Sequence, residues 1–232
     1  NNVYDVTVQA SDGAVSSTKA IAVTVTAAND NTPVITSSAT ASVAENTTAV
    51  MTVTATDADL PAQTLTYSIV GGADAAKFTI NSSTGALSFA TAPDYEVPTD
   101  AGGNNVYDVT VQASDGALSS TKAIAVTVTS VNDNTPVITS SATANVAENT
   151  TAVMTVTATD SDQPAQTLSF SIVGGADAAK FAINANTGSL SFLTAPDFEA
   201  PTDAGGNNVY DVTVQATDGA LSSTKAIAVT VT

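Results

Sequence analysis

The chain repeats itself at a fixed spacing, and this repeat constrains its fold more than any other feature. Glu148 lies 103 positions after Glu45, and Asp160 lies 103 positions after Asp57. The two copies are nearly identical along their whole length. A period of about 100 residues is too long for the unit of a solenoid and matches one small domain. The sequence therefore predicts tandem copies of a single domain.

The motif Asn-Asp-Asn-Thr-Pro begins at Asn29 and again at Asn132, and we interpret it as the boundary between copies. The predicted division of the chain is a linker at 29–32, a repeat at 33–131, a linker at 132–135 and a repeat at 136–232. Residues 1–28 match only the last quarter of a repeat and are predicted to be the C-terminal hairpin of a preceding one. Because a lone hairpin is marginal in water, we expect it to pair with strands outside this sequence or to be poorly ordered.

Within each copy, apolar and polar residues alternate with a period of two, which is typical of strands with one buried face. In the first copy the predicted strands cover 34–36, 50–55, 65–69, 78–80, 86–89, 107–113 and 124–128. Glycine-containing turn signals separate them, and one short helical turn is predicted at 74–77. This pattern predicts an all-β fold of tandem seven-stranded Greek-key β-sandwiches, similar to immunoglobulin domains.

Acidic residues dominate the charge of the chain, with 22 Asp and Glu against 5 basic residues and a formal net charge of −17. So few cations cannot neutralise phosphates, which argues against nucleic-acid binding, and an anionic membrane surface would repel the chain. The sequence has no apolar run long enough for a membrane span, so we expect no direct membrane insertion of this segment. It also contains neither cysteine nor histidine.

The carboxylates gather at the ends of predicted strands and in connections. Asp57 and Asp59 follow a predicted strand directly, Asp94 and Glu96 form a second pair with the same spacing, and Asp115 ends a long strand. Two carboxylates at i and i+2 in an extended chain project to the same side, where they repel each other unless a cation lies between them. We therefore predict cation sites, the alternative being solvated turn acids.

Calcium is the cation that this residue set favours. It takes six to eight oxygen ligands from carboxylates, Asn amides, backbone carbonyls and water. Zinc would need His or Cys, which the chain lacks, and magnesium demands a tighter octahedral geometry. The sequence therefore predicts Ca²⁺ as the bound ion.

The order and spacing of the motifs in both complete copies resemble those of a cadherin repeat. The motifs in the first copy are Ala44-Glu45-Asn46, Thr56-Asp57-Ala58-Asp59, Tyr67-Ser68-Ile69, Phe78-Thr79-Ile80, Thr84-Gly85-Ala86-Leu87, Asp94-Tyr95-Glu96, Val111-Gln112-Ala113-Ser114-Asp115 and Asn132-Asp133-Asn134-Thr135-Pro136. Each motif alone is weak, and their order and spacing together make the resemblance specific. It implies that calcium ions lie between successive repeats.

The resemblance also implies which residues bind the ions. At the boundary between the complete repeats the implied ligands are Glu45, Asp94, Glu96, Asn132, Asp133, Asn134, Asp160, Asp162 and Asp218. At the earlier linker they are Asn29, Asp30, Asn31, Asp57, Asp59 and Asp115, whose upstream partners lie outside the sequence. At the far end the implied ligands are Glu148, Asp197 and Glu199, which lack a following linker.

The linkers depart from the cadherin pattern at one position. Cadherin linkers usually begin with an additional Asp two residues before the first Asn, where this chain has Ser130 and Ala27. A cadherin junction holds three ions, so we expect two firmly held ions here and a middle ion that is weaker or absent. We expect one ion at the earlier linker.

Three other acidic residues are not assigned to the ion sites. The stretch 97–105 is longer than the usual connection in cadherins, and Asp100 within it is interpreted as ordinary loop charge. Asp74 and Asp108 are interpreted as lying outside the ligand set.

Together these features predict an extracellular array that calcium stiffens into the stalk of a cell-surface adhesin, with adjacent repeats as its partners. Extracellular calcium modules bind at about 10⁻⁴ to 10⁻³ M, so the array would be loaded only outside the cell. The Ala-, Thr- and Val-rich composition suggests a bacterial surface protein. The alternative is direct adhesion or filament assembly, through homophilic, β-strand-donation or polysaccharide contacts with other copies or a surface ligand.

Catalysis is not expected. The chain has no His or Cys for nucleophilic chemistry. Asp94 and Glu96 have the residue types of a glycosidase pair, but the sequence shows no aromatic-lined cleft for a sugar.

Overall fold

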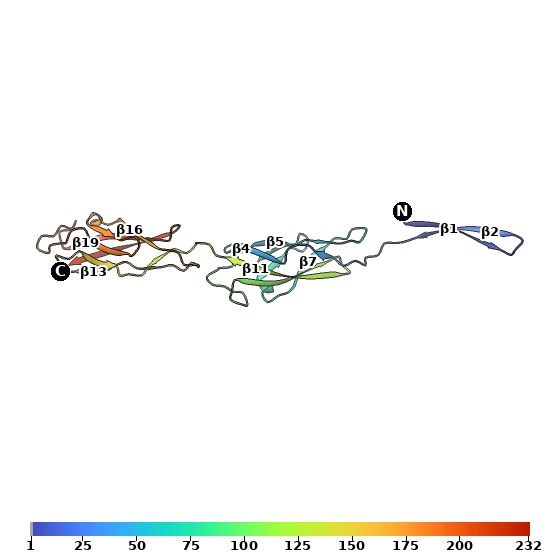
Figure 1. The fold of residues 1–232 in the computed structure, drawn as a ribbon, viewed down its shortest axis with the longest axis horizontal. Helices are drawn as coiled ribbons and strands as arrows, with labels where there is room; N and C mark the ends of the chain where they lie inside the picture. The colour runs from blue at the N-terminus through green and yellow to red at the C-terminus, as the bar shows by residue number, and fades with distance from the viewer. Residues whose placement is uncertain (1) are drawn as a thin grey trace. The chain divides into compact units, whose positions relative to one another are not determined.

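The structure is a computed structural model that describes residues 2–232, and strands make up nearly all of its regular elements (Figure 1). The chain forms two compact units. One contains the residues up to Pro93 together with 98–128, and the other contains 94–97 together with 129–232. The predicted all-β fold is confirmed.

The first complete repeat contains nine strand segments and one 3₁₀ turn. Their bounds are β3 Val34–Ile35, β4 Thr40–Ala44, β5 Ala49–Thr52, β6 Ala55–Thr56, β7 Thr66–Gly71, η1 Ala75–Lys77, β8 Phe78–Ile80, β9 Ala86–Phe89, β10 Val106–Ser114 and β11 Ser119–Thr129. One of the seven predicted strands, 50–55, is divided into β5 and β6, and β4 is an additional strand, which together account for the nine segments.

The second repeat has the same elements in the same order. Their bounds are β12 Val137–Ile138, β13 Thr143–Val146, β14 Ala152–Thr155, β15 Ala158–Thr159, β16 Ser169–Gly174, η2 Ala178–Lys180, β17 Phe181–Ile183, β18 Ser189–Phe192, β19 Val209–Thr217 and β20 Ser222–Val231. The sequence repeat is therefore a repeat of complete folding units.

Each repeat has one four-stranded sheet opposite a smaller three-stranded one. In the first repeat the strand orders are β4-β11-β10-β7 and β5-β9-β8, and a short β3-β6 ladder extends the smaller side. In the second repeat they are β13-β20-β19-β16, β14-β18-β17 and β12-β15. The β13–β20 pair is parallel, whereas the β19–β20 and β16–β19 pairs are antiparallel.

Alternation along β10 decides which of its faces is buried. Tyr107, Val109 and Val111 are buried, while Asp108 between them is exposed to solvent. Successive side chains of a strand point to opposite faces, so the odd-numbered residues fill the space between the sheets. Burial of these apolar side chains is the main stabilising contribution to each repeat.

An aromatic cluster lies at the centre of this core. The rings of Phe78 and Phe89 stack with centroids 4.6 Å apart, and Tyr107 meets Phe89 edge-on at 5.1 Å. Phe181, Phe192 and Tyr210 form the same cluster in the second repeat. Edge-on and offset-stacked pairs are the arrangements that aromatic rings prefer.

The prediction of one continuous strand at 50–55 is wrong. The segment is divided into β5, which pairs with β9, and β6, which pairs with β3. The change of partner occurs between Val53, whose N–H donates to Gly85 O at 2.8 Å, and Thr54, whose carbonyl accepts the Thr36 N–H at 2.8 Å. A period-two pattern cannot show this change because the alternation of buried residues continues across it.

The strands β4 and β13 were not among the predicted elements. In the second repeat, β13 pairs in parallel with β20, from Thr143 opposite Ala228 to Val146 opposite Val231. The four- and five-residue segments are too short to give a clear alternation of their own. Their pairing places Glu45 and Glu148 at the same end of each sandwich as the start of strands β10 and β19.

Residues 3–24 form the predicted hairpin, in which β1 (Val3–Ser11) pairs only with β2 (Ser16–Thr24). Every residue of both strands is exposed. Tyr4 is 64% exposed, whereas Tyr107 at the equivalent position is 1% exposed. Within the described residues, the face of this hairpin that is buried in a complete repeat is therefore exposed to solvent.

The interpretation of Asp100 as ordinary loop charge is wrong. Its side chain is buried, and it accepts the N–H groups of Asn104 and Asn105 at 3.0 Å each. Asp74 is buried as well and accepts the N–H groups of Ala101 and Asp108 at 2.7 and 2.9 Å. These carboxylates hold the long 97–105 connection in place, because each accepts two backbone N–H groups and a hydrogen bond to a charged acceptor is stronger than one between neutral groups.

Candidate metal sites

Three carboxylates converge at the start of each complete repeat. In the second repeat, oxygen atoms of Asp160, Asp162 and Asp218 lie within 4.8 Å of one another. Asp160 directly follows β15, and Asp218 directly follows β19. Because strand ends meet at one edge of a sandwich, residues 58 positions apart in the sequence become neighbours.

The first repeat has the equivalent group, made by Asp57, Asp59 and Asp115 within the same 4.8 Å limit. The predicted closeness of these carboxylates is confirmed. The predicted reason for it is wrong, because the i, i+2 pairs are not extended. The N–H of Asp59 donates to Oδ1 of Asp57 at 2.9 Å, and Asp162 makes the same bond to Asp160 at 3.1 Å. A side chain that accepts its own backbone two residues later forms a turn.

One oxygen in each group has no partner. Oδ2 of Asp57 and Oδ2 of Asp160 are buried and accept no hydrogen bond. A buried charged oxygen without a partner is costly, and such groups in folded proteins are normally paired or bound to a cation. These two atoms are therefore candidate cation ligands.

In each group the second Asp of the i, i+2 pair, Asp59 or Asp162, accepts hydrogen bonds from the linker. Oδ1 of Asp162 accepts the Asn134 N–H at 3.1 Å and the Asn134 side-chain amide at 2.8 Å. Burial raises the pKa of Asp162, but the hydrogen bonds from Asn134 and Asp133 outweigh this effect and hold the pKa below its ordinary value. Asp162 is therefore ionised at neutral pH and keeps a negative charge for a cation.

The last member of each group, Asp115 or Asp218, is oriented by the turn that follows its strand. Oδ1 of Asp218 accepts the N–H groups of Ala220 and Leu221 at 2.7 and 2.8 Å. The backbone hydrogen bond from Leu221 is the largest of several that keep the pKa of Asp218 below its usual value, and the Asn132 side chain adds to them. Asp115 has the same arrangement, with Asn29 in the place of Asn132.

A second kind of group lies at the other end of the repeat. Oxygen atoms of Glu148, Asp197 and Glu199 lie within 4.8 Å of one another in the second repeat. Oδ1 of Asp197 accepts the N–H groups of Glu199 and Ala200 at 3.0 and 3.2 Å, which fixes this turn. Oε2 of Glu148 accepts the Phe198 N–H at 2.9 Å. Glu148 and Glu199, which are 51 positions apart in the sequence, thus share one end of the sandwich.

The equivalent residues of the first repeat are Glu45, Asp94 and Glu96. Glu45 is buried directly after β4 and belongs to the first compact unit. Asp94 and Glu96 belong to the second, and Oδ1 of Asp94 accepts the Glu96 and Val97 N–H groups at 3.0 Å each. The turn that orients the acidic pair is therefore the same in both repeats.

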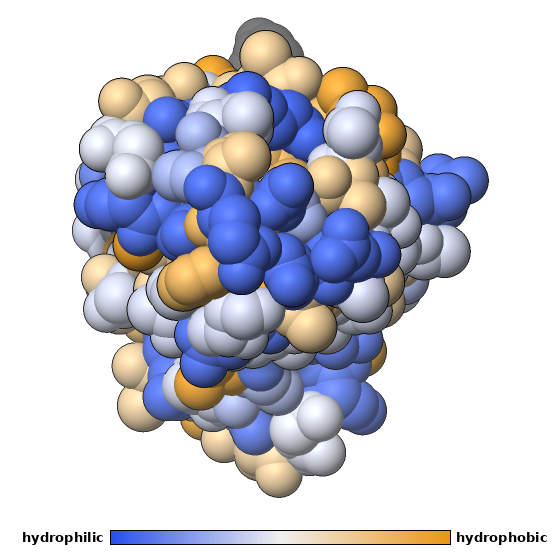
Figure 2. Space-filling view, turned by 90° about the vertical axis from the view of Figure 1, so that its left-hand side faces the viewer, coloured by the Kyte–Doolittle hydropathy of each residue, from blue (hydrophilic) through white to orange (hydrophobic). Residues whose placement is uncertain are grey.

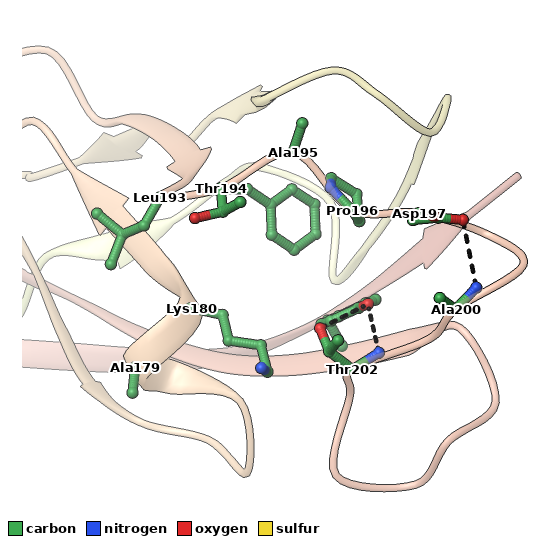
Figure 3. A pocket seen from close by; sticks show the side chains of 11 residues that line it. Ala179, Lys180, Leu193, Thr194, Ala195, Pro196, Asp197, Ala200 and Thr202 are labelled. Carbon is green, nitrogen blue, oxygen red and sulfur yellow. Dashed lines mark hydrogen bonds between the residues drawn. The ribbon is translucent and has the colours of Figure 1, made fainter.

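A pocket of about 370 Å³ adjoins this end of the second repeat (Figure 3). Asp197, Lys180 and the aromatic residues Phe192 and Tyr210 are among the residues that line it. The hydroxyl of Tyr210 accepts the Thr202 N–H at 3.2 Å. This bond attaches the connection between β18 and β19 to the core. The face of the structure at this end carries mostly hydrophilic residues around its centre, with scattered apolar ones (Figure 2).

The chemistry of these groups is that of hard-cation ligands. They offer carboxylate oxygens, with Asn side chains alongside, and the chain has no His or Cys that could add a nitrogen or thiolate ligand. Calcium accepts this kind of set with six to eight oxygens and tolerates irregular geometry. Within residues 2–232, every acidic residue in these groups is one that the sequence predicted.

Comparison with known proteins agrees with this description. The Cadherin domain model matches residues 39–129 and 142–232. Human Protocadherin Fat 1 is 35% identical over 180 residues, which are 74% of this chain and 4% of that protein. The chain therefore spans only a small part of this curated relative.

Solved structures show the same architecture over the whole chain. Extracellular cadherin domains 3–6 of Protocadherin Gamma B2 superpose with a TM-score of 0.65 and 25% identity, covering 100% of this chain and 59% of that one. The cis-dimer structure of Protocadherin gammaB7 domains 3–6 gives a TM-score of 0.67 and 26% identity, covering 99% and 58%.

The matches extend to location as well as fold. The matched domains are extracellular, and so is this segment. No helix among the described residues is long and apolar enough to cross a membrane. Two tandem matches to one domain family, over most of the chain, identify the protein: it belongs to the cadherin family.

Proposed function

We propose that the chain is a calcium-rigidified segment of the stalk of an extracellular adhesion protein. The observation that carries this proposal is the Asp160, Asp162 and Asp218 group, in which one buried oxygen of Asp160 has no partner. The relatives are cadherins, which are adhesion proteins rather than enzymes. A role in adhesion therefore fits the fold. The experiment below tests whether the rigidity of the segment depends on calcium.

The ligands of each junction come from three places in the sequence. Asp160, Asp162 and Asp218 would hold an ion on the second repeat, with Asn132, Asp133 and Asn134 beside it. Glu45, Asp94 and Glu96 would complete the junction, because their equivalents Glu148, Asp197 and Glu199 come together within a single unit. Asp57, Asp59 and Asp115, with Asn29, Asp30 and Asn31, would hold an ion in the same way at the earlier linker.

The proposed stiffening of the array by calcium follows from the negative charges of the carboxylates at each junction. Without a cation, several carboxylates of like charge share one junction, and their repulsion favours separation of the repeats. A bound Ca²⁺ neutralises them and takes ligands from both sides of the boundary, so the two repeats are held together. The expected affinity of about 10⁻⁴ to 10⁻³ M matches an extracellular location, where the ions are abundant.

Small-angle scattering and thermal unfolding of the full chain test this proposal. In millimolar Ca²⁺ we expect a single elongated shape and a higher Tm, and in chelator a broader distribution of dimensions and a lower Tm. Binding at about 50 times the dissociation constant would stabilise the protein by about 2 kcal/mol per site. Equal dimensions and equal Tm values under both conditions would refute the stalk function.

Direct association between copies is the second candidate function. The β1–β2 hairpin leaves apolar side chains exposed, including Tyr4, Val6 and Val23, and one matched protocadherin structure is a cis-dimer. Sedimentation analysis with and without Ca²⁺ distinguishes the two candidates. A calcium-dependent dimer would favour association, and a monomer under both conditions would favour the stalk.

A further inference from the structure

Each linker makes the same set of hydrogen bonds to the repeat that follows it. At the second linker, the N–H groups of Asp133 and Asn134 point to Oδ1 of Asp162 at 3.4 and 3.1 Å, and the Asn134 side-chain amide donates to the same oxygen at 2.8 Å. The carboxylate is fully buried. Three donors from the linker therefore surround one buried charge.

The first linker repeats this arrangement in the other compact unit. The N–H groups of Asp30 and Asn31 donate to Oδ2 of Asp59 at 3.1 and 3.0 Å, and the Asn31 side chain donates to Oδ1. Asp59 is buried like Asp162. In both units, therefore, the linker sequence Asn-Asp-Asn places two backbone N–H groups and one side-chain amide against this carboxylate.

Energetics favour keeping these bonds when no cation is present. A buried carboxylate that loses its donors is strongly unfavourable, and hydrogen bonds to a charged acceptor are stronger than neutral ones. Detaching the linker would leave Asp162 buried with fewer partners. It would also remove the contact between Asn132 and Asp218, which fastens the linker at a second point.

We propose that Asp59 and Asp162 are positioning residues that clamp each linker to the repeat that follows it before any cation binds. The clamp presets one half of each ion site. If the proposed calcium function holds, an ion then has only to recruit the ligands of the preceding repeat. Loss of calcium would accordingly release the preceding repeat from the linker, while the linker stays on the following repeat.

Amide hydrogen exchange of the full chain in chelator tests the clamp. We expect the Asp133 and Asn134 amides to be protected in the wild type. Asp162→Ala should speed their exchange about tenfold or more, since it removes hydrogen bonds to a charged acceptor. The Asp30 and Asn31 amides should be unaffected by this variant, and Asp59→Ala should produce the reverse pattern.

Each variant is therefore the matched control of the other, in nearly identical surroundings. Core amides such as those of Val214 and Val229 report whether the second repeat remains folded, and Asp162→Asn, which keeps an acceptor oxygen, should give intermediate exchange. Unprotected linker amides in the wild type, or equal effects of Asp162→Ala on both linkers, would overturn the clamp. Because every measurement is made without calcium, a failure of calcium binding would refute the stalk function and leave this result standing.

Discussion

Asp177 and Asp211 are joined by a reciprocal pair of hydrogen bonds. The N–H of Asp177 donates to the carbonyl of Asp211 at 2.9 Å, and Oδ2 of Asp177 accepts the N–H of Asp211 at 2.9 Å. Oδ1 of Asp177 accepts a third N–H, that of Ala204, at 2.7 Å. One buried carboxylate thus fastens the 3₁₀ turn to β19 and to the long connection before it.

Asp177→Asn should destabilise the second repeat by about 1–3 kcal/mol, because an amide oxygen can replace only one of the two acceptors of the buried carboxylate and the other backbone N–H loses its partner. Urea unfolding followed by circular dichroism measures this change. Asp211→Asn is the matched control, since its side chain is exposed and only its backbone takes part in the pair. A shift of under about 0.5 kcal/mol is expected for that variant. Equal effects of the two substitutions would contradict the role given to the Asp177 carboxylate.

The pH dependence of stability should depend partly on Asp203. The Asn207 N–H is the largest influence on the pKa of Asp203 and, with the Asn208 N–H, lowers it below the ordinary value in spite of burial. A carboxylate with a lowered folded-state pKa stabilises the protein above its unfolded pKa of about 4, and this contribution is lost as the pH falls through the folded value. The stability difference between wild type and Asp203→Asn should thus be largest at neutral pH and shrink below pH of about 4. A difference that is constant from pH 7 to pH 2 would refute this.

Gly85→Ala should be among the most damaging single substitutions in the first repeat. Gly85 has φ of +71°, and a Cβ there would lie 2.1 Å from the carbonyl oxygen of Val53. That carbonyl lies where the chain changes sheets between β5 and β6, so the backbone has little room to move. Gly116→Ala is the control, with φ of +100° but nothing within 4 Å of the added carbon.

We expect Gly116→Ala to cost about 1–2 kcal/mol from backbone strain alone, and Gly85→Ala to cost clearly more. Thermal and urea unfolding of both variants give the comparison. Similar Tm values would mean that the structure accommodates the close contact at Val53.

Asp160→Asn should weaken calcium binding at the second linker. The substitution removes the charge of a carboxylate that has a buried oxygen without a hydrogen-bond partner. We expect the dissociation constant of that site to rise by about tenfold, because charge count is a main determinant of calcium affinity. Calorimetric titration of the full chain measures this rise.

Asp57→Asn should affect the first linker's site in the same way and leave the second unchanged. Asp108→Asn removes an equal charge from an exposed strand position outside both groups, so its binding isotherm should match that of the wild type. Identical isotherms for all three variants would argue against these carboxylates as ligands.

Much of the candidate site could be predicted because the types and the spacing of its residues can be read directly from the sequence. All acidic members of the carboxylate groups in residues 2–232 were among the residues that the resemblance to cadherin repeats implied, and they lie at predicted strand ends or in connections. Their local conformation was not, since the Asp57–Asp59 and Asp160–Asp162 pairs form turns rather than extended chain. The linker's attachment to Asp162 was not predicted either, because it joins residues 28 apart through backbone donors that have no sequence signature.

The sequence by itself determined the repeat, the strand periodicity and the acid-rich, His- and Cys-free composition, because these depend only on residue type and spacing. Only the tertiary structure decided which carboxylates have both oxygens engaged by backbone N–H groups and which have a buried oxygen without a hydrogen-bond partner. Asp100 and Asp177 look like surface acids in the sequence, yet both are buried and fully engaged with backbone N–H groups. The oxygen of Asp160 that has no partner differs from them only through folding, because burial and hydrogen bonding are set by what packs around each carboxylate and not by its neighbours in the chain.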